Sequence, residues 1–73
     1  MKFNLNNDQI KIAHERVRTS LEAELLVRLV ALGINPEDFN EDTFVANDLL
    51  TSEKDIESFL NKIKEINTII NNL

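Results

Sequence analysis

The chain has 73 residues with no cysteine, and its 13 acidic residues outnumber eight basic ones to give a net charge of −5. This length predicts one domain whose core is marginal alone, and the lack of cysteine excludes disulfides and thiolate metal sites. The negative charge argues against a nucleic-acid partner, because a protein that binds nucleic acid normally carries a basic patch. No apolar run approaches the ~20 residues that cross a bilayer, and no signal peptide is visible. We therefore expect a soluble, cytoplasmic protein without a membrane partner.

The first element predicted is a long helix over residues 8–32, preceded by a lead-in whose Phe3 and Leu5 can pack on it. Asn6, Asn7 and Asp8 are each suited to cap its start, and Gly33 is suited to the left-handed position after its end. Side chains of one helical face recur at three- and four-residue steps. They are Ile10, His14, Val17, Leu21, Leu25, Leu29 and Leu32.

The second half of this helix is apolar on nearly every side, with Arg28 as its only polar break. A helix that is apolar all round has to be covered all round, and one antiparallel helix covers only one side. We therefore expect a homodimer or a higher oligomer. The residues expected in its interface are Leu25, Leu26, Leu29, Val30 and Leu32.

A connecting region follows over residues 33–51. It opens with asparagine, proline and two acids, which is typical of a helix start. The pattern predicts a short helix over residues 36–40, and Asp42 or Thr43 can cap a second one that includes Leu49. A connection this long and this apolar is not expected to lack structure.

A second long helix is predicted over residues 52–72, with Ser52 as its N-cap. Its apolar residues recur at heptad positions, with Leu60 beside them. They are Ile56, Phe59, Ile63, Ile66, Ile70 and Leu73. The predicted fold is all-α: residues 1–73 form a single domain, a small helical bundle of two long antiparallel helices joined by one or two short ones.

Negative charge is concentrated in residues 33–57, which carry Lys54 as their only base. The acids there are Glu37, Asp38, Glu41, Asp42, Asp48, Glu53, Asp55 and Glu57. Such a segment can dock a basic partner, but acids also gather at helix starts and keep a protein soluble. The residues expected to bind a partner are Glu37, Asp38, Phe39, Glu41, Asp42 and Phe44.

The spacing of Asp38, Asn40 and Asp42 resembles the first ligand positions of a calcium loop. Thr43 stands where that loop needs glycine, and Leu49 stands where it needs the bidentate glutamate. The ligand set is therefore incomplete. We predict no metal site.

Signatures of catalysis are also missing. His14 and Glu15 begin a zinc-protease pattern whose second histidine is replaced by Arg18, and no glycine-rich phosphate loop or nucleophile elbow exists. We therefore predict a protein that is not an enzyme and has no cofactor. A small basic site for an anionic ligand remains as an alternative, and its residues are Lys11, His14, Arg16 and Arg18.

These observations predict a non-enzymatic binding protein that acts by stoichiometric association with a basic-surfaced protein. The many Asn, Ile and Lys residues point to an AT-rich gene, as in many bacteriophages, which favours a phage-type inhibitor or accessory factor. The alternative is an oligomer that sequesters an anionic metabolite or nucleotide at a subunit interface.

Overall fold

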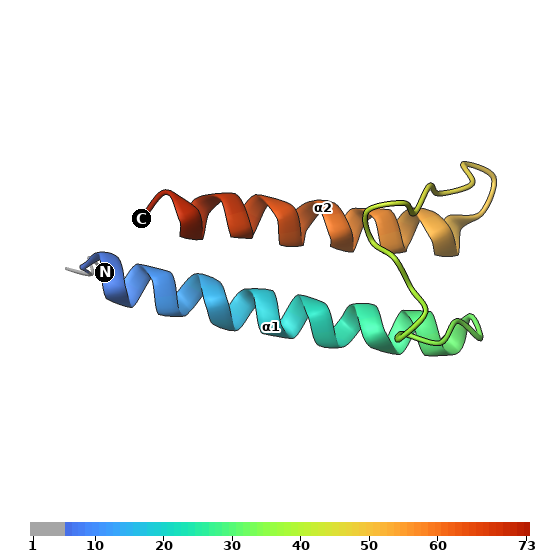
Figure 1. Ribbon diagram of the computed structural model, residues 1–73, viewed down its shortest axis with the longest axis horizontal. Helices are drawn as coiled ribbons and strands as arrows, with labels where there is room; N and C mark the ends of the chain where they lie inside the picture. Colours follow the sequence, from blue (N-terminus) through green and yellow to red (C-terminus); the bar gives the residue numbers. More distant parts are fainter. Residues whose placement is uncertain (1–5) are drawn as a thin grey trace.

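The computed structural model describes residues 6–73, which form a helical hairpin (Figure 1). Helix α1 spans Asn7–Ala31 and helix α2 spans Thr51–Asn71, and the two run antiparallel along a body of 43 × 24 × 18 Å. The part of the chain that the structure describes contains no strand. The expected all-α fold with two long helices is confirmed. Phe3 and Leu5 lie outside the described residues.

Both ends of α1 are fixed by local hydrogen bonds. Asn6 accepts from the backbone N–H of Gln9 at 2.9 Å, and the Gln9 side chain accepts from the backbone N–H of Asn6 at 3.1 Å, which forms a capping box. After the helix, Gly33 has a φ of +76°, and Ile34 N–H donates to the carbonyl of Leu29 at 2.9 Å. This is the Schellman arrangement that glycine favours. The helix bounds therefore fall one residue from those expected.

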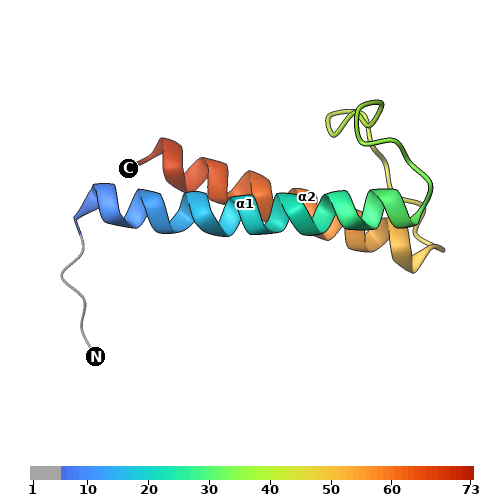
Figure 2. The ribbon, with the colours of Figure 1, turned by 90° about the horizontal axis from the view of Figure 1, so that it is seen from below.

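The core lies where the two helices approach the connecting segment, residues 32–50. Its buried side chains are Leu25 and Leu29 of α1 and Ile56, Leu60 and Ile63 of α2. Further apolar side chains pack around this cluster: Leu21, Ile34, Phe39, Phe44 and Phe59. Seen from below (Figure 2), the connecting segment projects to one face of the helix pair, and the described residues form no third layer on the other face.

Two residues of the expected α1 face are exposed. Val17 is 52% exposed and Leu32 is 42% exposed. Arg18, one residue further along the helix, lies beside α2 instead and donates to Asn67. The face of α1 that contacts α2 therefore includes Arg18 and not Val17. It is rotated about the helix axis relative to the predicted apolar stripe.

The two short helices expected in the connecting segment are turns instead. The turns lie at residues 36–38, 41–43 and 48–49. Asparagine side chains accept from backbone N–H groups two residues ahead, with Asn40 to Asp42 at 2.9 Å as an example. The same contact recurs at Asn35 and Asn47. These local hydrogen bonds compete with those of a helix, which explains the difference.

The start of α2 also differs from the expectation. The N-cap is Leu50, which has no side-chain cap, and Ser52 lies inside the first turn. Glu53 instead accepts from the backbone N–H of Asn47 at 3.4 Å, tying the helix start to the preceding turn. Neither described helix is long and apolar enough to cross a membrane.

Candidate functional site

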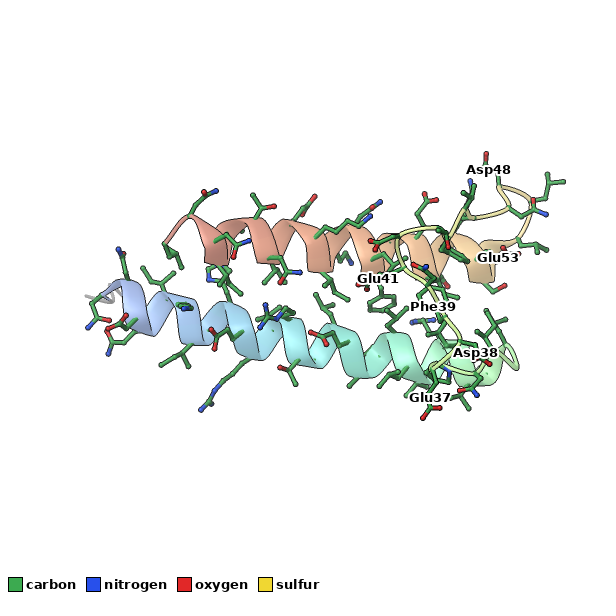
Figure 3. All side chains as sticks on the ribbon, in the orientation of Figure 1. Glu37, Asp38, Phe39, Glu41, Asp48 and Glu53 are labelled. Carbon is green, nitrogen blue, oxygen red and sulfur yellow. The ribbon has the colours of Figure 1, made fainter. Side chains whose placement is uncertain are left out.

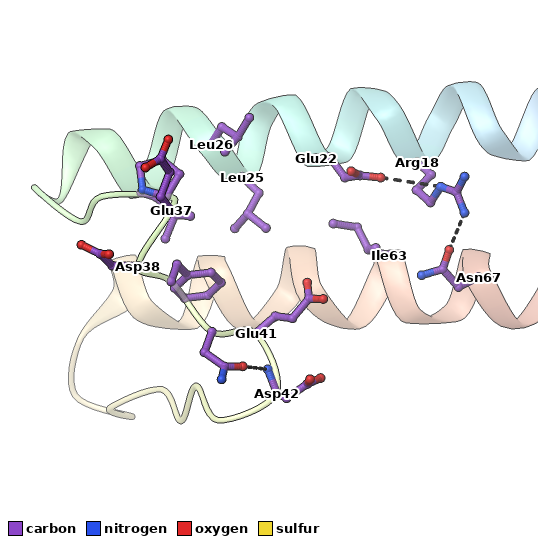
Figure 4. A pocket seen from close by; sticks show the side chains of 14 residues that line it. Arg18, Glu22, Leu25, Leu26, Glu37, Asp38, Glu41, Asp42, Ile63 and Asn67 are labelled. Carbon is purple, nitrogen blue, oxygen red and sulfur yellow. Dashed lines mark hydrogen bonds and ion pairs between the residues drawn. The ribbon is translucent and has the colours of Figure 1, made fainter.

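A hollow of about 770 Å³ opens where the connecting segment folds over the helix pair (Figure 4). Its floor is apolar and contains Leu25 and Leu29 from α1, Ile63 from α2, and Phe39 from the connecting segment. Three separate parts of the chain therefore build it. A cavity of this size is within the range of binding pockets.

Phe39 reaches the floor because a second ring supports it. Phe39 and Phe44 are half-buried, and their ring centroids are 5.4 Å apart at a tilt of 54°. This offset geometry is the favourable one for aromatic pairs. Phe44 packs against the core but does not line the hollow. The two rings expected as partner anchors thus have different roles: Phe39 faces the site and Phe44 holds it.

The rim of the hollow is acidic. Glu37, Asp38, Glu41 and Asp42 all line it (Figure 4) and are all exposed. Within residues 6–73, none of these four carboxylates accepts a hydrogen bond or forms an ion pair. They therefore keep their full capacity to bind cationic groups. Like charges so close also create a strong local negative field.

The backbone that carries this rim is held locally. Asn35 accepts from the N–H of Glu37 at 3.1 Å, and Asn40 accepts from the N–H of Asp42 at 2.9 Å. Asp48 lies further along the connecting segment, outside the hollow (Figure 3). The hollow thus receives four of the eight acids from the acidic stretch, together with Glu22 from α1.

One end of the hollow is closed by a polar contact that the sequence did not predict. Arg18 donates to the side-chain oxygen of Asn67 at 2.7 Å, and its Nε lies 3.6 Å from Glu22. Both partners use the guanidinium of Arg18, which is the only base among the described residues that line the hollow. The contact joins residues 49 positions apart, and no periodicity in the sequence signals it.

The residues of the alternative basic site are not all on one face of α1: Lys11, His14 and Arg18 are spaced i, i+3 and i+7 along one face, and Arg16 lies on another. His14 Nδ1 lies 2.8 Å from the Ile10 carbonyl of its own helix. Arg16 and Arg18 are two positions apart on α1, so they point in very different directions. Lys11 and Arg16 are exposed, and Arg16 borders a second, shallower groove of about 320 Å³.

The residues expected in an oligomer interface are divided by the fold. Leu25 and Leu29 are buried within the hairpin, with 7% and 2% of their surface exposed. Leu26, Val30 and Leu32 are exposed. Two of the five residues are therefore already used inside one chain, where α2 covers them.

Among the described residues, no three histidine or acidic side chains converge as metal ligands. Comparisons with protein-family models, with curated proteins and with solved structures found no match.

Proposed function

We propose that this chain is a non-enzymatic binding protein that associates stoichiometrically with a protein of basic surface through the hollow. The observation that carries the proposal is the pairing of an apolar floor with four exposed carboxylates that have no partner in the described chain. A partner that brings apolar and cationic side chains together satisfies both features.

The two features act at different stages of binding. A negative field around the hollow raises the rate of encounter with a positively charged protein, and salt screens it. Burial of an apolar side chain against Leu25, Phe39 and Ile63 then slows dissociation, because most differences in affinity appear in the off-rate. An amphipathic helix with apolar residues on one face and lysine or arginine beside them has this chemistry.

Occupation of one surface of a larger protein is sufficient to inhibit or assist it, which is the role we propose, in the manner of phage-type inhibitors and accessory factors. An anionic metabolite or nucleotide would meet the four carboxylates of the rim, while Arg18 is held by Glu22 and Asn67. Charge therefore favours a basic protein over an anionic ligand at this site.

The test starts from the partner captured by affinity from the native host and measures binding kinetics at low and high salt. Glu41→Lys with Asp42→Lys should lower the on-rate at least about tenfold at low salt, and high salt should reduce the difference. Asp48→Lys with Glu57→Lys is the matched control, because these exposed acids give the same charge change outside the hollow.

The control pair should lower the on-rate far less than the rim pair. Equal effects of the two pairs would show that only net charge matters, and the hollow would lose its role. An on-rate that neither pair nor salt changes would contradict the proposal altogether.

A further inference from the structure

A row of exposed side chains runs along α1 on a side that α2 does not cover. Its positions alternate in steps of four and three residues, so they lie on one side of the helix. The row, which we call the α1 seam, consists of Ile12, Arg16, Thr19, Ala23, Leu26 and Val30. Ile12 is 51% exposed, Leu26 49% and Val30 64%, and Val27 beside them is 64% exposed.

The shape of the hairpin leaves this side open. The radius of gyration is 14.6 Å, whereas a compact domain of this length has about 11 Å. The connecting segment covers only one face of the helix pair (Figure 2). A second hairpin laid along α1 would therefore thicken the body without lengthening it.

The seam contains a hole of the kind that receives a side chain from another helix. A groove of about 320 Å³ is lined by Ile12, Glu15, Arg16 and Thr19. Their spacing of i, i+3, i+4 and i+7 is that of the four-residue holes in paired helices. Leu26, 14 positions after Ile12 in the same seam, is an exposed side chain of suitable size.

Arg16 in the seam, Glu15 in the same groove and Glu24 beside the seam have no side-chain partner within the described residues. Arg18 pairs with Glu22, and Arg28 pairs with Asp55, but Arg16 and Glu24 form no side-chain hydrogen bond or ion pair within residues 6–73. Both are exposed. Their signs are opposite, which decides how two copies of α1 can be arranged.

We propose that the α1 seam binds a second copy of this chain, with the two α1 helices antiparallel about a two-fold axis that passes between Thr19 and Ala23. Leu26 of each copy then enters the hole beside Ile12 and Arg16 of the other. Ile12 faces Val30 of the second copy, Thr19 faces Ala23, and Arg16 comes within reach of Glu24. Each contact occurs twice, as a self-complementary two-fold interface requires.

A parallel two-fold arrangement has the opposite electrostatics. It would place Arg16 beside Arg16, and like charges across an interface are unfavourable. The antiparallel arrangement pairs each arginine with a glutamate. Charge complementarity thus selects both the occupant and its direction.

The first experiment is sedimentation equilibrium of the full chain at micromolar concentration, where a dimer is expected. Ile12→Lys with Val30→Lys brings lysines face to face in the proposed register and should give a monomer with unchanged helical circular dichroism. Val45→Lys with Leu49→Lys is the control, because these residues are 83% and 90% exposed outside the seam and the dimer should persist.

The second experiment exchanges the charges. Arg16→Glu alone and Glu24→Arg alone should each weaken the dimer at least about tenfold, and the double exchange should restore it, because the pair is recreated in the antiparallel register. Since the chain has no cysteine, Thr19→Cys chains mixed with Ala23→Cys chains should also form a disulfide faster than either chain alone.

A monomeric wild-type chain would overturn the proposal. So would a dimer that survives the two seam lysines, or single charge reversals that the double exchange fails to rescue. Leu26 of the seam also lines the hollow, but none of the residues varied in these experiments does, so failure here and failure of the proposed function are distinguishable.

Discussion

The two ends of the hairpin are held together by different forces. At the loop end, Leu25 and Leu29 of α1 and Ile56 and Leu60 of α2 are buried, and the rings of the connecting segment pack against them. At the open end, where the described residues place no third segment beside the helices, α1 has no buried residue before Leu25, and α2 has Ile66 as its buried residue. The long-range contact described there is the hydrogen bond from Arg18 to Asn67.

The difference shows what a third segment adds to a pair of helices. Two helices in contact exclude water along one line only, so the side chains on either side of that line remain partly exposed to solvent. The connecting segment covers one of these sides at the loop end through Phe39 and Phe44. Leu29 and Ile56, the most completely buried side chains described, belong to the core where three parts of the chain meet, and the same meeting creates the hollow.

The largest effect is expected at the centre of the loop-end core. Leu29→Ala should lower the free energy of unfolding by about 2–5 kcal/mol, because Leu29 is 2% exposed and a cavity would remain. Val17→Ala at the open end is the control and should change stability by less than about 0.5 kcal/mol, since Val17 is 52% exposed. Urea denaturation at one fixed protein concentration measures both, and equal losses would refute the contrast between the ends.

A smaller effect is expected where the chain leaves α1. Gly33→Ala should cost about 1–2 kcal/mol, because the φ of +76° is unfavourable for a residue with a Cβ. No atom lies within 4 Å of the position that the Cβ would occupy, so the cost is one of backbone conformation and not of a clash. Thermal unfolding monitored by circular dichroism detects it. A variant as stable as the wild type would show that this turn does not fix the loop end.

The smallest effect is expected for the polar contact of the open end. Asn67→Ala should cost only about 0.5–1 kcal/mol, because water can replace the lost acceptor at the partly exposed Arg18. A double-mutant cycle with Arg18→Gln isolates the contribution of the pair. A coupling free energy as large as the stability loss of Leu29→Ala would mean that this polar contact stabilises the open end as strongly as the apolar core stabilises the loop end.

Much of the secondary structure could be predicted because it depends on neighbours in the sequence. Asn6 and Gln9 form a capping box, and Gly33 ends α1 in the left-handed conformation, since both contacts span only a few residues. The prediction of short helices in the connecting segment was wrong for a related reason. Asparagines that signal helix starts also form turns, and sequence alone does not say which hydrogen bond is made.

Two long helices, with ends within one residue of those observed, follow from the amino-acid pattern alone. So do the heptad-spaced apolar face of α2 and the acidic character of the segment between the helices. Only the tertiary structure decided that Leu25 and Leu29 face α2 while Leu26 and Val30 do not, because all four are equally apolar. It also decided that Phe39 lines a hollow which Phe44 merely supports, and that Arg18 meets Asn67. The physical reason is distance along the chain: helix periodicity is a local property, whereas the rotation of one helix against another is set by packing among residues that are far apart in sequence.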